Sequence, residues 1–336
     1  VGYYALNGNT TGQENTAVGY LSLEGNTTGQ YNTALGYQTL KNVTTGERNT
    51  AIGRNTLTAN TGSRNTAVGM NCMEQNTSGN YNTAVGQRAL VNNTTASNNT
   101  AVGNSALDTN TTGAGNVAVG AEALESNTTG TPNTAVGFQA MENNTTGTHN
   151  VAVGMEALES NTTATSNTAV GTFCLLENTT GDSNTAVGRS ALGSNTTASN
   201  NTAVGRSALS ANTTGSSGVA VGFYALTSNT TGSNNTAIGR GAMSVNSTGA
   251  SNAAVGYQAL TSNTSGDQNT SIGFEALALN TTADNNTAVG YYALRSNTEG
   301  ARNVAVGVNA LDANTTANQN TAIGYEAMTS CTTGYS

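Results

Sequence analysis

A seventeen-residue repeat constrains this chain more than any other feature of its sequence. Residues 201–217 have the sequence NTAVGRSALSANTTGSS, and the same pattern returns throughout the 336 residues. A shortened copy, 1–14, comes first, and one residue is missing between Asn49 and Asn65. Full copies begin at Asn15, Asn32, Asn49, Asn65, Asn82, Asn99, Asn116, Asn133, Asn150, Asn167, Asn184, Asn201, Gly218, Asn235, Asn252, Asn269, Asn286, Asn303 and Asn320. Such a period indicates a stacked repeat architecture.

The fold class follows from comparing the copies position by position, with Asn201 at position 1 and Ser217 at position 17. Position 2 is mostly Thr or Val, position 3 is Ala except for Ser271, position 4 is Val, Ile or Leu, and position 5 is always Gly. This alternation predicts a short strand, with Thr and Val on one face and Ala on the other. We therefore expect an all-β parallel solenoid of about 20 coils, stacked about 4.8 Å apart, as a single domain over 1–336.

Within each coil, the sequence favours a particular core. The apolar position 4 and the Leu or Met at position 9 are expected to be buried, as in Val204 and Leu209. The invariant Gly205 predicts a positive φ or a close backbone approach. Positions 8 and 9 each accept only a few residue types. Two adjacent positions of this kind leave open a bent second strand or a single helical turn. Asn212 to Gly215 predict a turn.

A core of this kind is thin, so we expect lateral association between chains, with the row of Ala residues at position 3 as the seam. The same repetition makes end-to-end association plausible, because no capping copy is recognisable. The chain begins at Val1, in the middle of a repeat, and we expect it to be part of a longer protein.

The composition excludes several classes of function. Only 8% of the residues are charged and the net charge is −8, without a basic run, which argues against nucleic-acid binding. No apolar stretch is long enough to span a bilayer. Cys72 and Cys174 occupy the same position six copies apart, roughly 29 Å at strand spacing, so they are not expected to form a disulfide. We therefore expect small buried or near-surface thiols, with a disulfide between chains in an oxidising compartment as the alternative.

No enzyme is visible in the sequence. His149 is the one histidine and lies at a variable position. Glu122 and Glu125, and likewise Glu156 and Glu159, form outward pairs at positions 7 and 10. These pairs are expected to be solvated, with weak Ca²⁺ binding as the alternative because carboxylate oxygens suit that ion.

The turn contains a candidate modification site. The N-x-S/T pattern is the acceptor for N-linked glycosylation, and it recurs near position 12 in seventeen of the twenty copies. A turn rich in Asn and Thr could contain this pattern by composition alone. The alternative is that nearly every coil carries a glycan. The candidates are Asn9, Asn26, Asn42, Asn76, Asn93, Asn110, Asn127, Asn144, Asn161, Asn178, Asn195, Asn212, Asn229, Asn246, Asn263, Asn280 and Asn314. Further acceptor patterns begin at Asn98, Asn200, Asn234, Asn269 and Asn285.

The segments of the type Asn150-Val151-Ala152-Val153-Gly154 resemble the head repeats of the YadA-like trimeric autotransporter adhesins, and related repeats of phage and bacterial fibre proteins. The resemblance implies a left-handed β-roll, a trimer and display on a cell surface. It covers the whole chain, but only about five positions of each repeat, and the family's unit is shorter than seventeen residues.

Together these features predict a non-enzymatic subunit of an extracellular or surface-displayed fibre or adhesin. Its partners would be copies of itself and covalent glycans, without a cofactor. The alternatives are an ice-binding solenoid, with Thr at positions 2, 13 and 14, and the shaft of a phage tail fibre.

Overall fold

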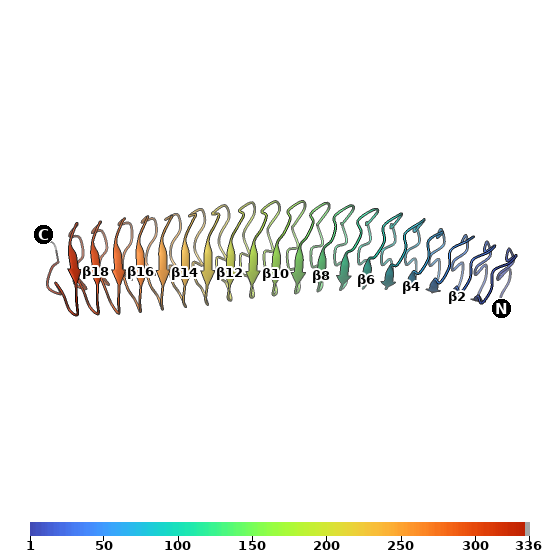
Figure 1. Ribbon diagram of the computed structural model, residues 1–336, viewed down its shortest axis with the longest axis horizontal. Coiled ribbons are helices and arrows are strands. Elements are labelled where there is room, and N and C mark those ends of the chain that lie inside the picture. The colour runs from blue at the N-terminus through green and yellow to red at the C-terminus, as the bar shows by residue number, and fades with distance from the viewer. Residues whose placement is uncertain (333–336) are drawn as a thin grey trace. The chain divides into compact units, whose positions relative to one another are not determined.

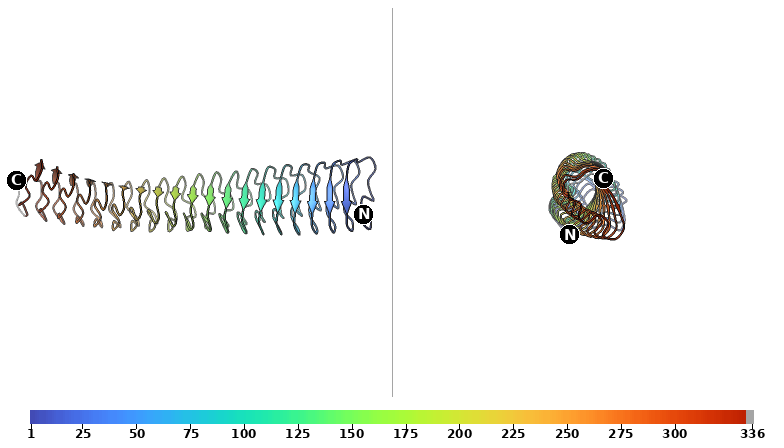
Figure 2. Two further views of the ribbon diagram at one scale, coloured as in Figure 1. Left: turned by 90° about the horizontal axis from the view of Figure 1, so that it is seen from below. Right: turned by 90° about the vertical axis from the view of Figure 1, so that its left-hand side faces the viewer.

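A computed structural model describes residues 1–332 and divides them into two compact units, 1–166 and 167–332. Both consist of short parallel strands, one per coil, joined by turns, and the described residues contain no helix. The predicted all-β parallel solenoid with a seventeen-residue repeat is therefore confirmed. Figures 1 and 2 show the strands of successive coils side by side within each unit.

The first unit contains nine strands of three residues each. They are β1 (Thr16–Val18), β2 (Thr33–Leu35), β3 (Thr50–Ile52), β4 (Thr66–Val68), β5 (Thr83–Val85), β6 (Thr100–Val102), β7 (Val117–Val119), β8 (Thr134–Val136) and β9 (Val151–Val153). Neighbouring strands pair in parallel with repeat positions in register. Thr50 pairs with Thr66 although their coil is one residue short, so the turn absorbs the deletion.

The second unit contains ten strands with the same length and register. They are β10 (Thr168–Val170), β11 (Thr185–Val187), β12 (Thr202–Val204), β13 (Val219–Val221), β14 (Thr236–Ile238), β15 (Ala253–Val255), β16 (Thr270–Ile272), β17 (Thr287–Val289), β18 (Val304–Val306) and β19 (Thr321–Ile323). Each pairs in parallel with its neighbour in this unit.

The strand faces the interior with its central residue. Ala203 is fully buried, whereas Val204 is 37% exposed, and the same contrast between positions 3 and 4 recurs in every strand. The prediction of a buried position 4 was therefore wrong, and so was the prediction that the row of Ala forms a seam between chains. The strand alternates, so only one of the two faces can point inward. The narrow interior accepts the methyl group of Ala and leaves the branched side chains outside.

The second core position was predicted correctly. Leu209 is buried, and Leu or Met at position 9 is fully buried in most of the other described coils. Position 8 is buried beside it, as at Ala208. In the coil that contains Cys72, the Sγ of that residue donates a hydrogen bond to Ala84 O, at position 3 of the next coil, over 3.3 Å. Positions 3, 8 and 9 therefore share one thin core.

The segment after the strand is neither a bent strand nor a helical turn. Ser207 and Leu209 both have left-handed backbone conformations, with φ of 55° and 52°, and the same two positions are left-handed in nearly every described coil. The N–H of Ser207 donates to Arg189 O in the preceding coil, and that of Leu209 to Ala225 O in the following coil. These bonds on both sides hold a conformation that a non-glycine residue seldom adopts.

Gly205 is required for two reasons, both foreseen in the sequence. Its φ is +132°, and a Cβ atom there would lie 2.5 Å from Gly222 O in the next coil. Gly241, at position 7, differs: its φ is +66°, and a Cβ atom would meet nothing closer than Gln258 Cγ at 3.4 Å.

We predict that Gly205→Ala destabilises the protein by at least about 1–3 kcal/mol, since strain and a backbone clash combine. Gly241→Ala is the matched control and should leave stability nearly unchanged, because other coils accommodate non-glycine residues at its position. Thermal unfolding followed by circular dichroism measures both. Equal losses in the two variants would contradict the assignment.

Candidate functional site

Two rows of asparagine side chains run through the interior of each unit. At position 1, the backbone N–H of Asn49 donates to Asn32 Oδ1 over 2.9 Å, and Asn32 Nδ2 donates to Gly46 O over 2.8 Å, at position 15 of its own coil. At position 12, Asn212 Nδ2 donates to Asn195 Oδ1 over 2.9 Å and to Gly215 O over 2.9 Å. The amides thus brace each coil internally and link it to the preceding one.

These rows bear on the glycosylation candidates. Fifteen of the seventeen are fully buried, all at position 12, and Nδ2 is the atom to which an N-linked glycan attaches. In Asn212 both Nδ2 hydrogens are already used within the core. Burial therefore argues against a glycan on the folded coil at Asn26, Asn76, Asn93, Asn110, Asn127, Asn144, Asn161, Asn178, Asn195, Asn212, Asn229, Asn246, Asn263, Asn280 and Asn314.

The remaining acceptor patterns differ in their exposure. Asn9 and Asn42 are exposed, as are Asn98, Asn200, Asn234 and Asn285, whereas Asn269 is buried. Asn42 is exposed because it lies at position 11; the buried position 12 of that coil is Val43. Val43 replaces the usual asparagine at position 12, and this apolar replacement was the signal in the sequence that position 12 faces the interior. Glycosylation itself stays a prediction.

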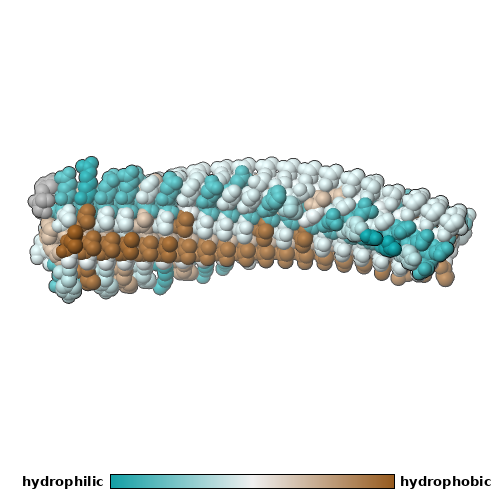
Figure 3. Space-filling model, viewed as in Figure 1, coloured by the Kyte–Doolittle hydropathy of each residue, from teal (hydrophilic) through white to brown (hydrophobic). Residues whose placement is uncertain are grey.

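The outer face of the strands presents a second repeated feature. Position 4 is half-exposed or exposed throughout, for example 46% at Leu35, 37% at Val153 and 40% at Ile238. Position 2, mostly Thr, lies beside it on the same face and is partly exposed. Figure 3 shows position 4 as a continuous brown row along the coils of each unit. We call positions 2 and 4 of the strands the Thr/Val face.

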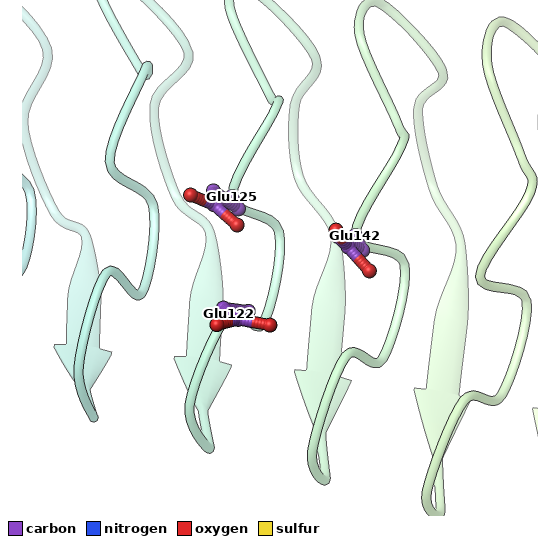
Figure 4. A group of neighbouring side chains, drawn as sticks. All are labelled: Glu122, Glu125 and Glu142. Atoms are coloured by element: carbon purple, nitrogen blue, oxygen red, sulfur yellow. The ribbon is translucent and has the colours of Figure 1, made fainter.

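An acidic cluster lies in the first unit, at the outward Glu pairs. Figure 4 shows Glu122 and Glu125 on the coil of β7 and Glu142 on the coil of β8. One carboxylate oxygen from each lies within 4.8 Å of the others, and Gln139 Nε2 donates to Glu122 Oε2 over 2.8 Å. The sequence had indicated the pairs, and stacking adds Glu142. Oxygen ligands suit Ca²⁺, but exposed carboxylates are also common without an ion.

The carboxylates of this cluster repel one another. Partial burial, followed by neighbouring negative charges, raises the pKa of Glu125 and Glu142, and similarly that of Glu159. The folded chain therefore holds these protons at a higher pH than the unfolded chain does. Their contribution to stability falls as the pH rises through the ordinary glutamate pKa and above it.

His149 is exposed, and its Nδ1 lies 3.1 Å from Thr148 Oγ1. Cys72 and Cys174 are buried free thiols, as expected, and burial raises the pKa of both to about 12. Within 1–332, no helix could cross a bilayer.

No protein-family model matches this chain, and a search of curated proteins finds no match either. The resemblance to YadA-like head repeats therefore stays a prediction.

We predict that Glu142→Gln raises the midpoint of thermal unfolding at pH 7, because it removes a repelled charge. The difference should shrink below the ordinary glutamate pKa, where the wild-type side chain is protonated as well. Glu299→Gln, at an exposed turn position, is the control and should change nothing. A lower midpoint for Glu142→Gln would show that the repulsion is compensated, as by a bound cation.

We also predict that Cys72 and Cys174 resist alkylation by iodoacetamide at pH 8, since the thiolate is the reactive form and both pKa values lie far above that pH. Unfolding in guanidinium should expose both to rapid labelling. Peptide mass spectrometry reports each site separately. Fast labelling in the native protein would contradict the buried assignment.

Proposed function

We propose that the protein is a non-enzymatic structural subunit of an extracellular or surface-displayed fibre, and that its copies associate through the Thr/Val face. The observation that carries this proposal is the exposed apolar row at position 4. A row of this kind, repeated without interruption across each unit, is a larger apolar surface than scattered exposed residues produce, and such patches mark interaction sites.

The same face explains why a second copy is a suitable partner. Its apolar side chains repeat once per coil, so two copies share the same spacing and every Val can meet an equivalent Val. Association would bury the remaining exposed part of each side chain, at about 25 cal/mol per Å² of apolar surface. The apolar interior of a coil holds only one large side chain, Leu or Met at position 9, beside the Ala residues of positions 3 and 8, so burial at an interface would add to stability. A trimer, as the resemblance implies, is one arrangement that uses this face.

An ice-binding solenoid is the second candidate, supported by the Thr residues at position 2, which stand in register beside the Val row. Position 13 is less suitable, because Thr213 Oγ1 already donates to Thr230 O over 3.0 Å. Thermal hysteresis of the purified protein distinguishes this candidate. A clear difference between the melting and freezing temperatures of its solution would favour ice binding over the fibre. The adhesin and tail-fibre roles remain proposals of the same structural class.

We predict that replacing Val187, Val204 and Ile238 together by Asp disrupts association and shifts sedimentation towards the monomer. These side chains are 37%, 37% and 40% exposed, so the fold should tolerate the change while an apolar interface should not. The control replaces Thr197, Thr214 and Thr248 by Asp; they are exposed turn residues of the same three coils, and the added charge is equal. A wild-type monomer, or equal effects of both variants, would refute the proposal.

A further inference from the structure

A hollow of about 470 Å³ opens on the side of the second unit, away from the strands. It spans the three coils of β13, β14 and β15. Its lining comes from positions 6, 7, 10 and 11 of these coils, so it is separate from the Thr/Val face. The residues that matter here are Phe223, Tyr224, Arg240, Gly241, Ser244 and Gln258.

The hollow exists because one side chain is missing. Gly241 is at position 7, where the preceding and following coils carry Tyr224 and Gln258. Ser207 and Tyr224 adopt φ of 55° and 56° at this position, close to the +66° of Gly241. The backbone therefore does not require glycine at 241. The consequence of the glycine is the space between the two neighbouring side chains.

The walls combine an aromatic surface with hydrogen-bonding groups. Tyr224 is 39% exposed and packs against Phe223 with ring centroids 4.1 Å apart at 56°. Gln258 belongs to the lining on the other side of Gly241, and the Ser244 hydroxyl lies 3.0 Å from Thr261 Oγ1. An apolar wall with a few polar groups is typical of small-ligand sites. A pyranose ring suits it, because its C–H face is apolar and its edge carries hydroxyl groups.

The charge at the hollow is positive. The Arg240 guanidinium lies 5.8 Å from the centroid of Phe223 and 5.7 Å from that of Tyr257, and cation–π attraction favours this placement. No Asp or Glu is part of the described lining. The nearby Glu275 carboxylate is engaged by Arg295 Nε at 2.8 Å. A guanidinium without a competing acid in the lining favours a ligand that carries a carboxylate.

We propose that this hollow binds one saccharide residue bearing a carboxylate, such as the terminal sialic acid of a glycan. The ring would lie against Tyr224, in the space above Gly241, and the carboxylate would pair with Arg240.

A second hollow in the same unit provides a comparison. It has about 430 Å³ and is lined by Phe173, Leu176, Glu177, Ser190 and Gly193, among others. Its charged group is a carboxylate, so an acidic sugar should be repelled there. Filling this hollow is therefore a suitable control.

The test measures binding of 3′-sialyllactose and of lactose to the full chain by saturation-transfer NMR and calorimetry. We expect the sialylated sugar to bind at least about tenfold more tightly, as one charged hydrogen bond provides. Gly241→Gln places into the hollow the side chain that the following coil carries at this position, and it should abolish binding. Arg240→Gln should remove the preference for the sialylated sugar. Gly193→Thr, which fills the second hollow, should change nothing.

Circular dichroism of each variant checks that the fold is intact. The proposal is overturned if 3′-sialyllactose does not bind the wild-type chain, if lactose binds equally well, or if binding survives Gly241→Gln in a folded protein. Each outcome is independent of lateral association, because the oligomeric state is measured separately and the lining residues lie outside the strands.

Discussion

Hydrogen bonding between successive coils is the interaction on which the rest of this structure depends. The backbone supplies part of it, as when Thr202 N–H donates to Gly218 O and Gly205 N–H to Val187 O, both over 2.8 Å. Buried asparagine amides supply a second part and converge on the position 15 carbonyl of their own coil. Because a buried polar group without a partner is costly, each amide favours the one register in which it is satisfied.

This register explains the unusual backbone of the coil. Left-handed residues at positions 7 and 9 would be strained in isolation, yet they alternate the direction in which N–H groups point, towards the preceding coil at Ser207 and the following coil at Leu209. The stack therefore satisfies backbone groups that a tight bend would otherwise leave without partners. It also limits the space inside, so that Ala is accepted at position 3 while Val and Ile stay outside.

The function we propose follows from that limited space. A coil that has room only for Ala at position 3 presents the Val and Ile side chains of position 4 in a row on its surface, where another copy with the same spacing can cover them. The variable positions 6, 7, 10 and 11 are less subject to this constraint, since most of their side chains are exposed or half-buried. The acidic cluster at Glu122, Glu125 and Glu142 and the hollow above Gly241 both occur at these positions, which is where a repetitive scaffold can acquire local chemistry.

The sequence by itself determined the parallel solenoid, its period, the strand at positions 2–4, the buried position 9 and the glycine at position 5. All of these follow from patterns that repeat along the chain. Only the tertiary structure decided which face of the strand points inward. Alternation places Ala203 and Val204 on opposite faces, but it does not indicate which of the two faces is buried. It also decided that Asn212 is buried rather than in a solvated turn. An amide in a turn and an amide in an interior row look alike in one coil, and they differ only once the next coil supplies the hydrogen-bond partner.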